Sequence, residues 1–206
     1  MTVQAVLTGD IVNSTGMGAA AEKRLLKSLQ QLLADHSFEF YRGDSFQVYI
    51  KDAGNALPVA LMCRAAAISI GGRAGVLSDI RISIGLGKVV QPVKTLGTGK
   101  GDAFVLSGRA FDTLAGTDNR LAISTANQLA NEGLEVIAAY LGAIFKVMTG
   151  KQAGVIFELL KGESQQEVAV KLKKSKSTIH QHVTAGRWTE IEKLVQHYKN
   201  IINQLL

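Results

Sequence analysis

The sequence predicts an α/β fold, in which a sandwich with a mainly antiparallel sheet precedes an all-helical region. Up to about residue 125, short apolar runs bounded by turn residues alternate with longer segments of helical periodicity. From about residue 130, nearly every segment repeats its apolar residues at helical spacing. The 206 residues suit one large domain or two small ones. We therefore expect an α/β domain at 1–128 and a helical region at 129–206.

The first region reads as a series of strands and helices in the order βαββαββαβ. The expected strands are residues 3–8, 38–42, 46–50, 80–86, 89–93 and 121–124, and the expected helices are 19–33, 57–70 and 103–114. The second and third strands flank the dipeptide Gly43-Asp44, which is typical of a tight hairpin turn. This order predicts a sheet with its helices on one face.

The second region reads as five helices without a proline-rich or charged linker before them. They are expected at residues 134–147, 152–160, 165–172, 177–185 and 188–205. The first and last of these carry more apolar surface than so small a domain buries alone. We therefore expect them to offer surfaces for a homodimer, although either helix can instead be intradomain core.

Composition and charge limit the class of protein. The net charge is +6, and residues 151–206 hold nine Lys or Arg against five Asp or Glu, which favours a polyanionic partner. The one cysteine, Cys63, excludes an internal disulfide and a cysteine-based zinc site. Neither a basic and apolar leader nor an uncharged, unbroken apolar run of 18 residues is found. We expect a cytoplasmic protein without a membrane partner.

A two-helix pattern near the C-terminal end predicts DNA binding. Ser164 followed by Glu167 is a capping box, which begins a helix by satisfying free backbone amides. After a short lysine-rich turn comes a second helix with apolar anchors four residues apart, Ile179 and Val183. Its other face carries short or flexible hydrogen-bonding groups, as the reading of base edges in a major groove requires.

This stretch resembles the helix-turn-helix of bacterial regulators. The residues expected to contact DNA are Lys173, Lys174, Lys176, Ser177, Thr178, His180, Gln181 and Arg187. The lysines lie where the turn would meet phosphates. The alternative is a three-helix module used for protein interaction or dimerisation.

Two carboxylates mark the other candidate site. Asp10 ends the first expected strand, and Asp44 lies at the hairpin tip. If the hairpin pairs beside the first strand, both carboxylates reach one edge of the sheet, where they could hold Mg²⁺ or another divalent cation. The alternative for each is a turn or helix cap.

The segments around these residues resemble those of the SatD family. The resemblance spans roughly residues 3–115 and is strongest at 9–14, 43–47 and 82–87. The same segments resemble, more distantly, the class III nucleotidyl cyclase domain, which implies a cyclase-like or ferredoxin-like sandwich.

The cyclase resemblance implies roles for particular residues. Asp10 and Asp44 match the two metal-binding aspartates, the carbonyl of Ile11 would join them, and Arg109 matches the transition-state arginine. Val105 and Phe40 stand where cyclases have a transition-state asparagine and a base-selecting lysine. Because neither side chain can play those parts, efficient cyclisation is not expected.

The glycine-rich residues 97–101 include Lys100 and precede an expected helix, whose first amides could face an anion. A flexible connector is the equal alternative, and the Walker pattern is not met. With Arg109, Lys100 is the expected contact for a nucleotide or other anionic small ligand.

The favoured function is a DNA-binding transcriptional regulator with a ligand-sensing N-terminal domain. The alternatives are a metal-dependent nucleotidyl cyclase or other phosphoryl-transfer enzyme, and a non-catalytic interaction module.

Overall fold

A five-stranded sheet forms the centre of the N-terminal part of the chain, in a computed structural model that describes residues 3–41, 43–70 and 78–205. The strands are β1 (Gln4–Val12), β2 (Ser37–Tyr41), β3 (Ser45–Ile50), β4 (Asp79–Gly87) and β5 (Leu121–Thr125). Their order in the sheet is β2-β3-β1-β4-β5, and only β4 and β5 run parallel. The predicted mixed α/β class with a mainly antiparallel sheet is confirmed. Arg42, the last residue of the second predicted strand, lies outside the described residues.

Eight α-helices are present in the described ranges. They are α1 (Ala19–Leu33), α2 (Ala56–Ile70), α3 (Asp102–Leu114), α4 (Gln128–Lys146), α5 (Gly150–Leu160), α6 (Gln165–Lys171), α7 (Lys176–Ala185) and α8 (Trp188–Gln204). Short 3₁₀ turns occupy Ser14–Gly16, Ala53–Asn55 and Leu96–Thr98. The predicted helices are all found, and α4 begins six residues earlier than its apolar pattern suggests. The side chain of Asn127 accepts the amide of Ala130 and caps that earlier start.

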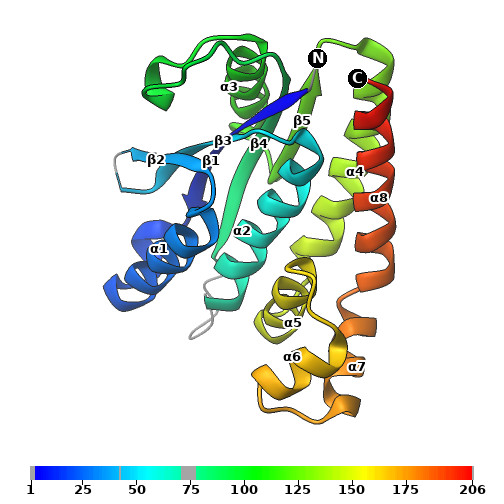
Figure 1. Cartoon of the computed structure of the whole chain (residues 1–206). Coiled ribbons are helices and arrows are strands. Elements are labelled where there is room, and N and C mark those ends of the chain that lie inside the picture. Colours follow the sequence, from blue (N-terminus) through cyan, green and yellow to red (C-terminus); the bar gives the residue numbers. More distant parts are fainter. Residues whose placement is uncertain (1–2, 42, 71–77, 206) are drawn as a thin grey trace.

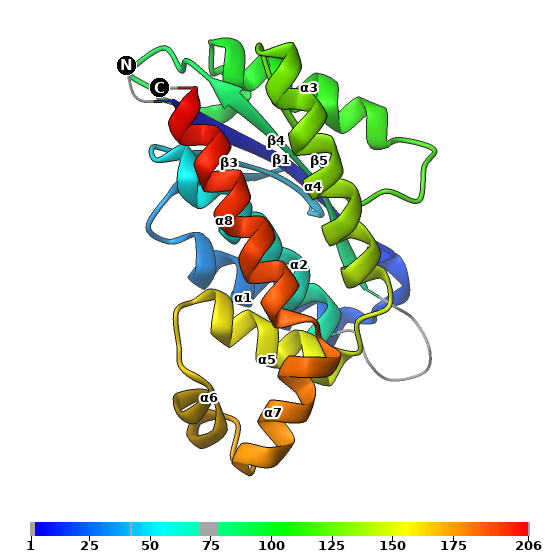
Figure 2. The same cartoon turned by 90° about the vertical axis from the view of Figure 1, so that its right-hand side faces the viewer.

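The helices cover both faces of the sheet, so the prediction of helices on one face is wrong. Helices α1 and α2 lie on one face and α3 on the other (Figures 1 and 2). On the α3 face, β4 carries the small residues Ser83 and Gly85. A side chain at Gly85 would collide with the backbone of Ala103 and Ser107, because α3 packs directly on this glycine.

The predicted strand at residues 89–93 is also wrong, since this segment is a loop with a cis bond between Gln91 and Pro92. Strand β4 already pairs with β1 on one side and with β5 on the other. No edge of β4 is therefore free for a hairpin partner.

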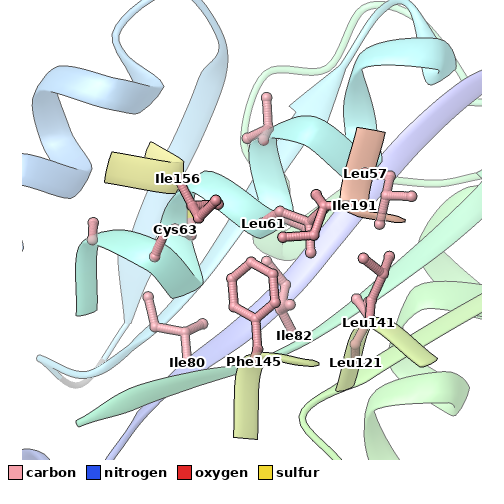
Figure 3. Packing of buried hydrophobic residues seen from close by; sticks show 14 of the residues in the cluster. Leu57, Leu61, Cys63, Ile80, Ile82, Leu121, Leu141, Phe145, Ile156 and Ile191 are labelled. Atoms are coloured by element: carbon pink, nitrogen blue, oxygen red, sulfur yellow. The ribbon is translucent and has the colours of Figure 1, made fainter. Parts of the chain in front are cut away.

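The buried core is continuous from the sheet to the C-terminal helices. Figure 3 shows side chains from β4, α2, α4, α5 and α8 converging on one cluster, including Ile82, Leu61, Phe145, Ile156 and Ile191. Residues on both sides of the predicted boundary at 128 belong to this cluster. The helical region thus packs on the sandwich through a shared apolar layer.

Helix α2 is the centre of that layer. The stretch Ala53–Ile70 is long and apolar enough, by composition, to cross a membrane, and 67% of it is buried inside the protein. Helix α2 contacts the sheet on one side and α5 and α8 on the other. A helix that is apolar on all sides is what such a central position requires. Cys63, on this helix, is buried, and burial raises the pKa of its thiol to about 12.

Candidate nucleic-acid interface

Helix α6 begins at a complete capping box. The amide of Ser164 donates to Glu167 Oε2 at 2.7 Å, and the amide of Glu167 donates to Ser164 Oγ at 3.3 Å. These hydrogen bonds lower the pKa of the Glu167 carboxyl, the backbone bond from Ser164 most. The predicted helix start is confirmed at this residue. On its inner side, α6 buries Val168 and Ala169.

The turn between α6 and α7 closes as a Schellman motif without glycine. The amide of Lys174 donates to the carbonyl of Ala169 at 3.0 Å, and the amide of Lys173 donates to that of Val170 at 3.2 Å. Lys173 lies in the left-handed region with φ of 53°. Glycine or asparagine ordinarily occupies this position, because a side chain there is strained by about 1–2 kcal/mol.

Helix α7 begins at Ser175, whose side chain accepts the amide of Thr178 at 3.1 Å. Ile179 and Val183 are buried, as predicted, and fix the inner face of the helix. The predicted contact residues that are fully exposed are Lys173, Lys174, Lys176, Ser177, His180 and Gln181. Thr178 is half-buried and shares a hydroxyl hydrogen bond with Ser175. The structure therefore brings seven of the eight residues together on one turn and one helix face.

The three lysines of this surface carry uncompensated charge. Within the described part of the chain, none of Lys173, Lys174 and Lys176 forms an ion pair, and Lys176 only donates a 3.4 Å hydrogen bond to Gln166. Lys171 differs, because it binds the carboxylates of Glu158 and Glu163. Those hydrogen bonds, first the one to Glu158, raise the pKa of Lys171. The turn is thus an exposed site of positive charge that is free to meet an anion.

Both views place α6 and α7 at the end of the molecule farthest from the sheet (Figures 1 and 2). They are held there by packing against α5. Gly186, which follows α7, lies so close to Ile156 of α5 that an added Cβ would be 3.2 Å from that side chain. Helix α7 is therefore packed closely against α5 and keeps its other face exposed.

Arg187, the eighth predicted DNA contact, has internal partners. It lies beyond the end of α7, is half-buried, and donates to Glu190 at 3.1 Å and to the hydroxyl of Tyr140 on α4. Its guanidinium also stacks 5.1 Å from the centre of the Tyr140 ring. The structure thus uses Arg187 to join the start of α8 to α4.

The carboxylate of Asp10 forms an ion pair with a cationic side chain of the protein, Arg81. Asp10 lies opposite Arg81 in the β1–β4 pairing, and its two oxygens accept from Arg81 at 3.1 and 2.6 Å. The hydrogen bond that Arg81 donates to Asp10 raises the pKa of Arg81. Arg81 also stacks 5.2 Å from the ring centre of Phe111 on α3. A bidentate pair of this kind is strong and oriented.

Asp44 lies close to Asp10 along the chain pairing, in the turn just before the neighbouring strand β3. Its carbonyl accepts the amide of Ile11 at 3.0 Å, and its carboxylate accepts from the hydroxyls of Ser14 and Ser45 at 3.5 and 3.3 Å. The hairpin therefore does pair beside the first strand, as the magnesium hypothesis needs. A divalent cation would still have to displace Arg81 from Asp10, so the present arrangement does not offer two free carboxylates. Among the described residues, no three His, Cys, Asp or Glu side chains form a group that could hold a metal.

The other predicted ligand contacts lie elsewhere. Arg109 is exposed on α3 and lines a cavity with residues of β5 and α4. Lys100 lines a separate small cavity in the 90–100 loop. Val105 is 50% exposed, and Phe40 packs 5.7 Å from the ring of Phe46. The structure therefore brings Asp10, Ile11 and Asp44 together but places Arg109 and Lys100 in different cavities.

Arg81 is the residue at this candidate site that was not predicted from the sequence. Arg81 alternates with isoleucines in a buried strand, and a charged residue in such a place needs a partner across the sheet. This pattern is the one feature of the sequence from which an ion pair of Arg81 could have been predicted. The register that makes Asp10 the partner depends on how β1 and β4 pair, which the local sequence does not specify.

Comparison with known proteins gives structural neighbours only. No family model and no curated protein matches the chain, so the SatD resemblance stays a prediction. A structure of a bacterial light-regulated adenylyl cyclase is 14% identical with a TM-score of 0.43, and covers 60% of this chain and 76% of that one. A second one is 13% identical with a TM-score of 0.39, and covers 60% and 43%. The active GGEEF domain of a diguanylate cyclase from Vibrio cholerae is 14% identical with a TM-score of 0.43, and covers 62% and 85%. Scores this low say nothing of activity or ligand.

The left-handed Lys173 can be tested by glycine substitution. We expect Lys173→Gly to leave the free energy of unfolding unchanged or to raise it by up to about 1 kcal/mol, because glycine removes the strain but loosens the unfolded chain. Lys174, which is not left-handed, is the matched control: Lys174→Gly should lower stability by about 0.4–1 kcal/mol. Urea denaturation measures both. Equal destabilisation by the two changes would contradict the left-handed turn.

Proposed function

We propose that the protein binds DNA through α6 and α7, with α7 as the recognition helix in a major groove. The observation that supports this most directly is the uncompensated lysine turn, which leads into an exposed polar helix face at the end of the molecule. A lysine at a position where glycine is favoured suggests that its side chain serves a purpose outside the fold.

The lysines of the turn and the polar side chains of α7 would have different roles in recognition. Lys173, Lys174 and Lys176 would contact phosphates and position the protein on the duplex. Gln181 can bond an adenine in bidentate fashion, and Ser177 is short enough to reach a base edge near the start of the helix. Helix α6 would lie across the DNA backbone, since the first helix of such a unit supports the second, which enters the groove.

The phosphate contacts are tested by replacing all three lysines with alanine. We expect weaker binding to every DNA sequence and a salt dependence whose slope falls by up to about 2.7, since each lost phosphate contact removes about 0.9. Fluorescence anisotropy with random and selected duplexes over a range of salt concentrations measures both quantities.

Gln181→Ala should instead relax the sequence preference at one base pair, by about 1–3 kcal/mol.

The matched control replaces Lys23, Lys27 and Lys51, which are exposed and lie in or near the sandwich, and removes the same total charge. This control variant should keep most of the wild-type affinity and slope. If the control loses as much as the triple variant of the turn, or if the wild type binds no DNA at low salt, DNA binding through α6 and α7 is wrong.

A homodimer would double the contact with DNA, and α4 offers a surface for it. The large exposed apolar side chains of α4 and its C-cap are Leu129, Val136, Tyr140 and, at the C-cap, Val147. They are separated by seven, four and seven residues, which places them within about 20° of one line along the helix. The same stripe on a second copy gives a self-complementary interface, and two helix-turn-helix units then reach two half-sites. Helix α8, the other predicted dimer surface, buries Ile191, Tyr198 and Ile202 within the chain.

The α4 stripe is tested with Val136→Glu. We expect the wild type to be a dimer and Val136→Glu to be a monomer, because a buried carboxylate without a partner opposes association. Light scattering after gel filtration measures the mass. Val105→Glu, at an exposed valine of α3, is the control and should stay dimeric. A monomeric wild type at high protein concentration would contradict the proposal.

Metal-dependent phosphoryl transfer, such as nucleotidyl cyclisation, is the second candidate. The observation in its favour is that Asp10 and Ile11 of β1 lie beside Asp44, in the turn before the neighbouring strand β3, as a two-carboxylate metal site requires. It ranks second because Arg81 binds both oxygens of Asp10, and because Arg109 and Lys100 line other cavities.

The enzyme hypothesis is tested by turnover. We expect purified protein with ATP or GTP and Mg²⁺ to form no cyclic nucleotide or pyrophosphate above the background of an Asp44→Asn variant. Chromatography of the reaction mixture measures the products. Turnover that is present in the wild type and lost in Asp44→Asn would make the enzyme the better function.

A further inference from the structure

A cavity of about 380 Å³ lies where the sandwich meets α4. The residues around it come from the end of β1, from α2, from the start of β4, from the loop before β5 and from α4. Figure 2 shows α4 passing along this side of the molecule. The volume is within the range of small-molecule sites in proteins.

Arg64 of α2 lies fully buried in the wall of this cavity. Its Nε and Nη2 donate to the carboxylate of Asp79 at 3.1 and 2.7 Å, and its guanidinium stacks 4.8 Å from the ring centre of Phe145. The remaining nitrogen, Nη1, is buried and has no hydrogen-bond partner. A buried guanidinium nitrogen without an acceptor is unfavourable and uncommon in proteins.

Ser78 supplies a second unpartnered group in the same wall. It is fully buried, and its hydroxyl has no hydrogen-bond partner. Two of the three unpartnered buried side-chain atoms among the described residues thus belong to residues of this one cavity. Both can donate a hydrogen bond, and the guanidinium nitrogen can only donate.

The charges around the cavity leave a positive excess among the described residues. Arg64 is paired with Asp79, and Lys146 is paired with Asp118 at 3.3 Å. Arg120 has no carboxylate partner there and donates to the carbonyls of Thr117 and Asn119. Free donors with a net positive charge select an anionic acceptor.

We propose that this cavity binds a small organic acid, with its carboxylate at Arg64 Nη1 and Ser78 Oγ. Apolar side chains form one part of the wall, among them Ile68, Ala139, Phe145 and Met148, and they suit a ligand with an apolar body. One guanidinium nitrogen and one hydroxyl match a single carboxylate, and the apolar part of the wall disfavours a polyphosphate. The residues of this site are different from the proposed DNA contacts on α7 and the turn before it.

Thermal unfolding of the full chain tests the site with benzoate as the probe. At ten times its dissociation constant, benzoate should raise the melting temperature by roughly 3–6 °C, because it binds the folded state alone. Benzamide has the same shape without the charge and should give no shift. Inorganic phosphate should give none either, and a shift with phosphate but not with benzoate would overturn the assignment of the ligand.

Two variants locate the binding without breaking the Arg64–Asp79 pair. Ser78→Ala removes an unpartnered hydroxyl, so it should fold normally and weaken benzoate binding severalfold. Gly142→Leu places a side chain at the cavity wall, where an added Cβ meets no other atom within 4 Å, and should abolish the shift. Ser69→Ala makes the same chemical change on α2 outside the cavity wall and should bind as the wild type does. A benzoate shift that survives both Ser78→Ala and Gly142→Leu, or the absence of any shift in the wild type, would overturn the proposal.

Discussion

The burial of α2 between the sheet and the C-terminal helices is the constraint on which the rest of the structure depends. On one side the helix packs against β1 and β4, and on the other against α5 and α8. The hydroxyl of Tyr198 on α8 is buried and donates to the carbonyl of Ala53 at 2.7 Å, which ties the last helix to the segment just before α2. Removing either layer would expose apolar surface of α2. The sandwich and the helical region therefore stabilise each other, although they look separate in the sequence.

The same constraint explains the buried ion pair. Arg64 is the only charged residue of α2, and the position of the helix takes its guanidinium out of water. A buried charge is tolerated only with a partner, and Asp79 at the start of β4 supplies it. The pair satisfies two of the three nitrogens, so the geometry that stabilises Arg64 also leaves Nη1 without an acceptor.

The elements of the fold could be predicted from sequence because each carries its own local signal. The capping box at Ser164 and the apolar anchors of α7 gave the helices of the proposed DNA-binding unit with the right type and nearly the right bounds. The errors arose where distant parts of the chain decide the outcome. The order of the elements predicted helices on one face, and only the docking of α3 on Gly85 shows that the other face is covered as well. The ion pair of Asp10 with Arg81 depends on strand register in the same way.

Helix α4 is the physical link between the cavity and the proposed DNA-binding unit. Ala139 and Gly142 line the cavity, while Tyr140 between them bonds to Arg187 just beyond α7. A ligand alters DNA affinity only if it binds two arrangements of this link with different affinity, since equal binding shifts nothing. A shift of α4 along its axis would change the contact of Tyr140 with Arg187, and that contact joins the start of α8 to α4. Because Arg187 lies two residues after the end of α7, a change in this contact would be expected to alter the angle of α7, the proposed recognition helix.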